Sequence, residues 1–395
     1  GVVDALFGTG LARPLEGEAA RVVAAIRRAG KPVVAADLPS GLSSDTGERI
    51  GPAVRAARTV AFGAPKICHV AYPARASCGS IVVADIGISR AVLQRLQPRL
   101  ALAEAADIRR LLPERPPDSH KGRFGRLAVV AGSRGKAGAA ILAARGALRA
   151  GAGLVTVFCA ESLQDAIVSA LPEAMTHGLA EEEGAIAEAA ARPALSALRF
   201  FDAAVVGPGL STAPGTVGFL RRLLKARLPL VCDADALNAF AGEPGALAGR
   251  VLTPHPGEAA RLLGVPAREI QADRIGAARR LARASRAVVL LKGAASLLAT
   301  DGGRRVTVNP TGTPLMSTAG SGDVLAGAIG AFLAGGLRGA EAALVSAWLH
   351  GAAGELCARR LGDAGLLARE LAEALPLARR ALDATEGAGR ETQDD

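Results

Sequence analysis

Residues 317–336 read STAGSGDVLAGAIGAFLAGG, and both the fold and the chemistry of this chain are best argued from this stretch. A glycine-rich turn, Gly320, Ser321 and Gly322, leads directly into an apolar run that predicts a helix from Asp323 to Leu333. The first N–H groups of a helix have no partner within it, and the helix dipole adds positive character there. The turn is therefore a candidate site for an anion, such as a phosphoryl group in transfer.

Asp323 lies at the start of this helix, beside the expected anion site. A carboxylate there would repel an anionic ligand unless it had a proton to take, so a general base for a substrate hydroxyl fits the position. Asp is also common at helix starts, and the Gly-Ser-Gly-Asp sequence could serve only to cap the helix. The motif alone leaves both interpretations open.

The segments around this turn predict an α/β fold. Apolar β-type runs alternate with helical stretches and read LAVVAG, LVTVFCA, DAAVVGPG, PLVCDAD, VLTP and AVVLLKG. Helices are expected at Gly138–Ala150 and, beyond the turn, at Ala340–Arg360. Such alternation indicates a largely parallel sheet with helices on both faces. Residues 296–310, SLLATDGGRRVTVNP, instead predict a hairpin with DGG at its turn.

Three further motifs accompany the glycine turn. KGAAS and TPHPGE each follow a predicted strand, and NPTGT immediately precedes the turn. Ligands in open α/β sheets bind beyond the carboxyl ends of the strands, so we expect all three motifs near one site. The presence of these three motifs favours a phosphoryl-transfer site at the glycine turn over a turn that only caps the helix.

Length and composition predict two domains that handle phosphate-bearing small molecules. A chain of 395 residues exceeds the usual size of one domain. The net charge of +10 suits nucleic acid or small phosphate ligands equally well. With one Trp, one Tyr and no basic run interleaved with aromatics, the chain has few surfaces for base stacking, so no nucleic-acid partner is expected.

The cysteines and the hydrophobic runs predict a soluble cytoplasmic protein. The five cysteines contain no C-x-x-C pair, so neither a disulfide framework nor a zinc site is indicated. Cys159 and Cys232 fall within apolar strands and are expected in the core. The longest run of apolar residues and glycine, Val324–Leu337, is too short to span a bilayer, and no signal peptide opens the chain.

Six motifs occur in order along residues 118–355, and they read HKGRFGRLAVVAGSRGKAGAA, VVGPGL, CDADALN, TPHPGE, LLKGAAS and NPTGTPLMSTAGSGDVLAG. Together they resemble the pattern of the ADP/ATP-dependent NAD(P)H-hydrate dehydratases. The resemblance implies a ribokinase-like three-layer αβα domain, which we place at residues 105–385, followed by a disordered tail at 386–395. It also implies that ADP or ATP phosphorylates the ring hydroxyl of S-hydrated NADH or NADPH, after which loss of phosphate restores the nicotinamide.

The same resemblance implies roles for individual residues. Asp323 would take the hydroxyl proton, and Gly320, Ser321 and Gly322 would hold the moving phosphoryl group. The implied contacts are Lys292, Gly293, Ala294, Ala295, Ser296 and Gly322 for the adenine nucleotide, and Ala139, Gly209, His255 and Asp323 for the hydrated dinucleotide. Asp235 and Asn238 would lie near the phosphates or near a Mg²⁺ ion, which Glu258 could hold through water.

Each of these residues also has a structural interpretation. Lys292 could be a solvated charge at a strand end, and His255, between two prolines, could be only a rigid-turn residue. Asp233 and Asp235 could be turn formers. His350 lies, with Trp348, in an apolar helix and is expected to pack rather than to bind a ligand.

The N-terminal part predicts the second half of a doubly wound Rossmann-like layer. GVVDALFGTG reads as a buried strand that enters a glycine-rich turn, as though an earlier half-domain were missing. DALFGTGLARPLEG and AADLPSGLSSDTGE resemble the second half of the NAD(P)H-hydrate epimerase domain, and we assign residues 1–104 to it. Such a half-layer should leave apolar faces uncovered.

By this second resemblance, Asp4 and Ser40 would hold a K⁺ ion and Asp37 would face the nicotinamide ring. The residues implied to bind the substrate pyrophosphate are Gly8, Thr9, Gly10, Leu11, Ala12, Arg13 and Pro14, since a Gly-Thr-Gly turn can point backbone N–H groups at phosphate. The family's earlier Asn-Asn-Gly-Gly-Asp-Gly motif has no counterpart in the sequence, which puts epimerase activity in doubt.

Two other functions stay open from sequence. One is a kinase of the same fold that acts on a vitamin precursor or a sugar and keeps its phosphorylated product. The other is a non-catalytic nucleotide- or RNA-binding module, although neither loss of the acid/base residue nor a basic aromatic face is seen. A homo-oligomer is expected.

Overall fold

The computed structural model describes residues 1–96 and 98–384, and it divides into two compact units, Gly1–Arg99 and Leu100–Asp395. The large unit begins at Leu100 rather than at residue 105, because strand β5 (Leu100–Leu102) hydrogen-bonds to β16 (Arg305–Val308) in its sheet. The tail expected at 386–395 lies outside the described residues. Within the described part, no helix is long and apolar enough to cross a membrane.

The large unit contains a ten-stranded sheet in the order β5-β16-β15-β14-β13-β12-β11-β6-β7-β8. Its other strands are β6 (Arg126–Val130), β7 (Leu154–Ala160), β8 (Met175–Leu179), β11 (Ala203–Val206), β12 (Leu230–Cys232), β13 (Val251–Leu252), β14 (Val288–Leu291) and β15 (Leu297–Thr300). All neighbours from β8 to β14 are parallel, whereas β15 is antiparallel to both of its neighbours. The predicted hairpin at residues 296–310 is therefore confirmed. A separate two-stranded pair consists of β9 (Glu181–Glu182) and β10 (Ala185–Ile186).

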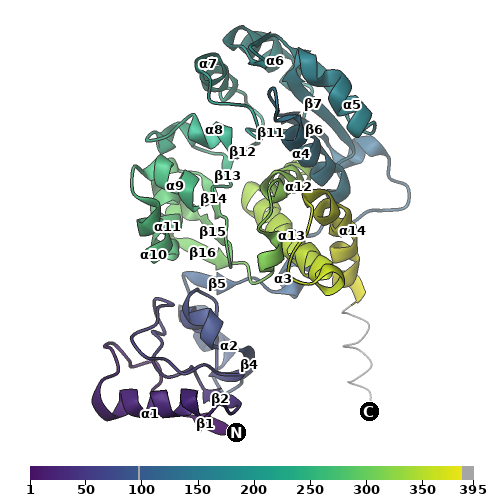
Figure 1. The fold of residues 1–395 in the computed structure, drawn as a ribbon. Coiled ribbons are helices and arrows are strands. Elements are labelled where there is room, and N and C mark those ends of the chain that lie inside the picture. The colour runs from purple at the N-terminus through teal and green to yellow at the C-terminus, as the bar shows by residue number, and fades with distance from the viewer. Residues whose placement is uncertain (97, 385–395) are drawn as a thin grey trace. The chain divides into compact units, whose positions relative to one another are not determined.

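Helices cover both faces of this sheet, as Figure 1 shows. They are α3 (Ala105–Leu111), α4 (Ala137–Ala150), α5 (Gln164–Ala170), α6 (Ala191–Leu198), α7 (Pro214–Leu223), α8 (Asp235–Asn238), α9 (Pro256–Leu263), α10 (Ala267–Ala272), α11 (Arg274–Ser285), α12 (Ser321–Ala334), α13 (Gly339–Leu361) and α14 (Ala368–Ala384). Helix α11 packs on β14, β15 and β16, whereas α12 packs on β6, β11 and β12. The predicted three-layer αβα architecture is confirmed.

Within the ten-stranded sheet, the sequence did not predict the two edge strands, β8 and β5. Strand β8 reads MTHGL, which has few β-branched residues, and its Met175 is 49% exposed. Edge strands are covered on fewer sides than central ones, so their sequences carry a weaker hydrophobic pattern.

Cys159 and Cys232, which were expected in the core, are fully buried in β7 and β12.

The small unit contains a parallel sheet in the order β1-β2-β3-β4. Its elements are β1 (Val2–Asp4), α1 (Gly17–Arg28), β2 (Val33–Ala36), β3 (Arg58–Phe62), β4 (Ser80–Ala84) and α2 (Arg90–Leu96). Val33 and Ala35 are buried on one side of β2, whereas Val3, Val34 and Val82 stand 75%, 39% and 47% exposed on the other. The expectation of an uncovered apolar face is therefore confirmed.

Helices α4 and α12 approach each other closely enough for their backbones to touch. A Cβ atom at Gly146 would overlap the carbonyl oxygen of Val324, and one at Gly327 would overlap that of Ala143. Only glycine allows this spacing, and it draws the whole of α12 against α4 and the sheet. The position of the Gly320–Gly322 turn at the start of α12 follows from this packing.

Gly146→Ala should lower the free energy of unfolding by about 1–3 kcal/mol, because the added methyl group must push two backbones apart. The matched control is Gly138→Ala in the same helix, where a Cβ meets no atom within 4 Å and helix propensity should stabilise by up to about 1 kcal/mol. Urea-induced unfolding measures both, and equal midpoints for the two variants would disprove the close contact.

Candidate functional site

The turn at the start of α12 presents backbone N–H groups without partners. Gly320 is the N-cap and adopts φ of 87°, a left-handed conformation that favours glycine. Within the described residues, the N–H groups of Gly322 and Asp323 have no hydrogen-bond acceptor, and no side chain caps this helix. These donors, together with the positive end of the helix dipole, form a site suited to an anion.

The side chain of Asp323, the third residue of α12, makes no hydrogen bond within the described part of the chain, so it does not cap its helix. Its side chain is half-buried. Burial, followed by the negative charge of Asp233, raises the pKa of the Asp323 carboxyl to about 7, although Lys292 opposes this shift. A carboxyl that titrates near neutral pH suits proton transfer better than a permanently ionised cap does.

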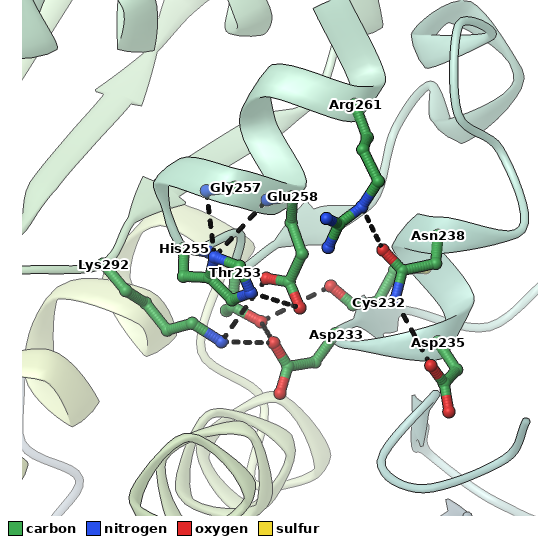
Figure 2. A network of polar contacts seen from close by, with 10 residues as sticks. All are labelled: Cys232, Asp233, Asp235, Asn238, Thr253, His255, Gly257, Glu258, Arg261 and Lys292. Atoms are coloured by element: carbon green, nitrogen blue, oxygen red, sulfur yellow. Dashed lines mark hydrogen bonds and ion pairs between the residues drawn. The ribbon is translucent and has the colours of Figure 1, made fainter. Parts of the chain in front are cut away.

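Lys292 and Asp233 form a buried ion pair beside this turn (Figure 2). The Nζ atom of Lys292, which follows β14, lies 2.6 Å from Oδ1 of Asp233 and 4.0 Å from Oε2 of Glu258. Thr253 Oγ1 donates a second hydrogen bond to the same Asp233 oxygen at 2.8 Å. Burial alone would lower the pKa of Lys292, but the charges of Asp233 and Glu258 outweigh it and raise that pKa. Lys292 is therefore a cation held in place, not a solvated strand-end charge.

Gly322 lies directly against this ion pair. An ideal Cβ at Gly322 would stand 3.3 Å from Lys292 Nζ and 3.9 Å from Asp233 Oδ2. The ammonium group therefore adjoins the unpaired N–H groups at the start of α12, and a larger side chain at residue 322 would crowd it. Cation and amides together make one electropositive site.

His255 is the N-cap of α9. Its Nδ1 accepts hydrogen bonds from the N–H groups of Gly257, at 2.9 Å, and Glu258, at 3.4 Å, so that nitrogen carries no proton. The backbone N–H of His255 donates in return to Glu258 Oε2 at 2.8 Å. Burial, and then the charge of Lys292, lower the pKa of His255 and favour the neutral ring. The imidazole is 50% exposed, so one side of it remains free to meet a ligand.

A second polar group surrounds Asp235. Its Oδ2 accepts a hydrogen bond from the Ser211 N–H at 2.9 Å and pairs with Lys136 Nζ at 3.4 Å, while Oδ1 accepts from the Asn238 amide at 3.2 Å. Arg261 Nε in turn donates to Asn238 Oδ1 at 2.8 Å (Figure 2). These contacts link α8 to α9, to the loop after β11 and to the loop before α4. Asp235 therefore does more than form a turn.

Ala234, between the two aspartates of this site, has a strained backbone. Its φ of 48° and ψ of −118° are rare for a residue with a Cβ. The strain allows Asp233 to face Lys292 while Asp235 binds the Ser211 N–H. Gly207 adapts to the same loop, because a Cβ there would overlap the Asp233 carbonyl oxygen.

Ala139 and Gly209 come together although 70 positions separate them in sequence. A Cβ on Gly209 would lie 3.0 Å from that of Ala139, and φ at Gly209 is 62°. Lys136, which pairs with Asp235, adjoins the same place, since its carbonyl oxygen is 3.0 Å from the ideal Gly209 Cβ. Two of the four residues that the resemblance assigned to dinucleotide binding thus share one small-residue surface near the Asp235 group.

Hydrogen bonds from the Arg274 side chain support the Lys292–Ser296 loop. The guanidinium of Arg274 donates to the carbonyl oxygen of Ala294 and, at 3.3 Å, to that of Lys292. Gly293 and Ala295 adopt φ of 140° and 51°, so the loop turns sharply after β14. Of these five residues, Lys292 is the one whose side chain adjoins Gly322.

No group of three His, Cys, Asp or Glu side chains in the described residues forms a metal site. Mg²⁺ in nucleotide sites commonly binds one or two carboxylates, several waters and the phosphates themselves. Asp233 and Glu258, which lie beside the anion site, fit that mode of binding.

In the small unit, Asp4 and Ser40 are buried and bonded to each other. Asp4 Oδ1 accepts from Ser40 Oγ at 2.6 Å, and Oδ2 accepts from the Ser40 N–H at 2.8 Å. Asp37, with φ of 65°, pairs with Lys66 and accepts a hydrogen bond from the Phe62 N–H at 3.0 Å. The residues assigned to pyrophosphate binding, 8–14, are exposed except for half-buried Leu11.

Sequence reasoning did not identify Thr253, Arg261, Lys136 or Arg274 as parts of this site. Thr253 opens the quoted TPHPGE motif, and Lys136 lies in the SRGK loop before α4, so their positions at strand ends were available as a signal. Arg261 and Arg274 lie on helices and approach the site from the side. No local pattern marks them.

Lys292→Met should lower the free energy of unfolding by about 3 kcal/mol, because Asp233 and Glu258 would remain buried without their cation. The loss should shrink as the pH falls, because burial raises the pKa of Glu258 and its carboxyl then takes up a proton above the ordinary glutamate range. As a control, Arg280→Met breaks the half-exposed pair with Glu269 and should cost less than about 1 kcal/mol. A pH-independent loss in Lys292→Met would contradict the assignment of the pair.

Two family profiles match the chain. One, described as NAD(P)H-hydrate dehydratase, matches residues 127–377, and the other, described as YjeF-related protein N-terminus, matches residues 1–68. The bifunctional NAD(P)H-hydrate repair enzyme Nnr of Moorella thermoacetica is 45% identical over 388 residues, which are 97% of this chain and 73% of that protein. The Escherichia coli enzyme of the same name is 36% identical over 370 residues, or 94% of this chain and 70% of that protein.

Solved structures match the large unit. The ADP/ATP-dependent NAD(P)H-hydrate dehydratase of Bacillus subtilis, co-crystallised with ATP/Mg²⁺, is 32% identical with a TM-score of 0.62, covering 71% of this chain and 98% of that one. A ribokinase-like superfamily protein of Enterococcus faecalis gives a TM-score of 0.62 at 25% identity, covering 72% of this chain and 96% of that one. With one profile spanning more than half of the sequence and relatives aligned almost throughout, the chain belongs to the family of bifunctional NAD(P)H-hydrate repair enzymes.

Proposed function

We propose that the large unit dehydrates S-hydrated NADH or NADPH, with ADP or ATP as phosphoryl donor. The observation that carries this proposal is the juxtaposition of a carboxyl that titrates near neutral pH, Asp323, with the unpaired N–H groups of its helix start and the Lys292 cation. Similarity to a dehydratase that was co-crystallised with ATP/Mg²⁺ supports the choice of nucleotide and ion.

In the proposed reaction, Asp323 takes the proton of the substrate's ring hydroxyl. The hydroxyl oxygen then attacks the terminal phosphorus of the nucleotide. The bond from that phosphorus to the leaving oxygen breaks, while the Gly322 and Asp323 N–H groups and Lys292 stabilise the negative charge on the phosphoryl oxygens. The C–O bond to phosphate then breaks, the neighbouring ring carbon loses a proton, and the ring double bond returns. Asp233 and Glu258 would hold Mg²⁺ beside this site, where the ion would supply positive charge against the nucleotide phosphates.

The binding assignments follow the same geometry. Lys292–Ser296, the loop supported by Arg274, would line the adenine nucleotide. Ala139 and Gly209 would let the hydrated dinucleotide approach their backbones closely, and the exposed side of His255 would meet it from α9. Asp235 and Asn238 would orient its polar groups or the nucleotide phosphates.

A small-molecule kinase would use the same phosphoryl-transfer groups and keep its product. Similarity to repair enzymes along nearly the whole chain favours dehydration over that alternative. Release of phosphate together with recovery of the nicotinamide separates the two.

For the small unit, we propose that these residues belong to an epimerase site. Asp4 and Ser40 supply oxygens of the kind that K⁺ binds, although both Asp4 oxygens already accept hydrogen bonds from Ser40. Residues 8–14 and Asp37 would contact the dinucleotide. The homo-oligomer and the cytoplasmic setting remain predictions.

Incubation with hydrated NADH, Mg²⁺ and either ADP or ATP should restore the dihydronicotinamide absorbance, with one phosphate released per molecule repaired. Asp323→Asn should lower turnover by about 100-fold to 10,000-fold, the range for loss of a general base, with little change in nucleotide affinity. Stable phosphorylated product without recovered absorbance would instead indicate a kinase, and normal turnover in Asp323→Asn would remove Asp323 from the mechanism.

A further inference from the structure

His350, in the middle of α13, contacts the backbone of the anion-binding turn. The side chain is buried, with 6% exposed, and its Nε2 lies 2.9 Å from the carbonyl oxygen of Ser321. A carbonyl oxygen can only accept a hydrogen bond, so Nε2 carries a proton. Burial lowers the pKa of His350 to about 4, which leaves Nδ1 unprotonated and the ring neutral. The contact is therefore a neutral N–H···O=C bond between two helices.

The carbonyl of Ser321 and the N–H of Gly322 belong to a single peptide unit. That unit is planar and trans, so its C=O and N–H bonds point in opposite directions and turn together. Because the hydrogen bond from His350 restrains this carbonyl, it also restrains the direction of the Gly322 N–H. This N–H is one of the unpaired donors beside Lys292.

The same part of α13 also anchors the NPTGT loop that precedes the turn. Asn309 Nδ2 donates to the carbonyl oxygen of Ala347 at 3.0 Å, and Thr311 Oγ1 donates to that of Trp348 at 2.9 Å. One helical segment, residues 347–350, therefore holds both ends of the chain that forms the turn.

We propose that His350 is a positioning residue that aims the Gly322 N–H at the transferring phosphoryl group. This inference rests on the proposed anion site. His350 reaches that site only through the peptide unit of Ser321, so its loss should weaken stabilisation of the transition state more than binding of either substrate. A residue needed only for packing would affect stability and every kinetic constant together.

Four variants test this inference, with kcat, the KM for hydrated NADH and the Kd for ADP as the readouts. His350→Leu should lower kcat by about 10-fold to 100-fold, less than the loss of a whole oxyanion donor, with KM and Kd changed by less than about 3-fold. His350→Gln can place an N–H donor near the position of Nε2 and should recover most of kcat, whereas His350→Asn is too short to do so. Val345→Ala, in the buried face of the same helix, should lower Tm and leave kcat unchanged.

Full kcat in His350→Leu would overturn the inference, as would equal kcat in the Gln and Asn variants. If His350→Leu does not fold, the Gln and Asn pair makes the same comparison. Asp323→Asn, measured in parallel, separates this inference from the proposed reaction: low turnover in Asp323→Asn beside normal turnover in His350→Leu rejects only the positioning role.

Discussion

The proposed chemistry depends on the ion pair between Lys292 and Asp233, which lies next to Gly322. This pair places a buried cation next to unpaired helix N–H groups, and the two together attract a phosphoryl group. The paired carboxylate has a second effect, because the negative charge of Asp233 helps to raise the pKa of Asp323. One arrangement thus supplies both an electropositive cradle and a carboxylate basic enough to accept a proton.

The position of the Gly322 and Asp323 N–H groups is set by helix packing away from the reacting groups. Glycines at 146 and 327 let α4 and α12 touch, and a Cβ at Gly330 would overlap the Val205 side chain on the sheet, so α12 lies unusually close to its neighbours on two sides. Its first turn is then held by His350 from α13. Small residues in the helix interior and a polar contact at its end together determine where the N–H groups point.

Much of the large unit could be predicted from local patterns, since each central strand is a short apolar run and each ligand motif follows a strand end. Lys292 was identified in this way, whereas Gly322 and Asp323 were identified from the glycine-rich turn at a helix start, and the structure brings the three residues together. The environment of Asp323 could not be predicted, because its pKa depends on burial and on Asp233 and Glu258, which lie after β12 and in α9, far from Asp323 in the sequence. The role of His350 was missed because a histidine within an apolar helix looks the same whether it packs or donates a hydrogen bond to another helix.

The most direct measurement is a pH titration of the Asp323 carboxyl by ¹³C NMR, with Asp323→Asn to identify its signal. The account predicts a midpoint of about 7, so that below this pH the carboxyl is protonated, cannot accept the hydroxyl proton and turnover falls. A midpoint near the ordinary aspartate value of 3.8 would show that burial and Asp233 do not tune this group, and it would contradict the central claim.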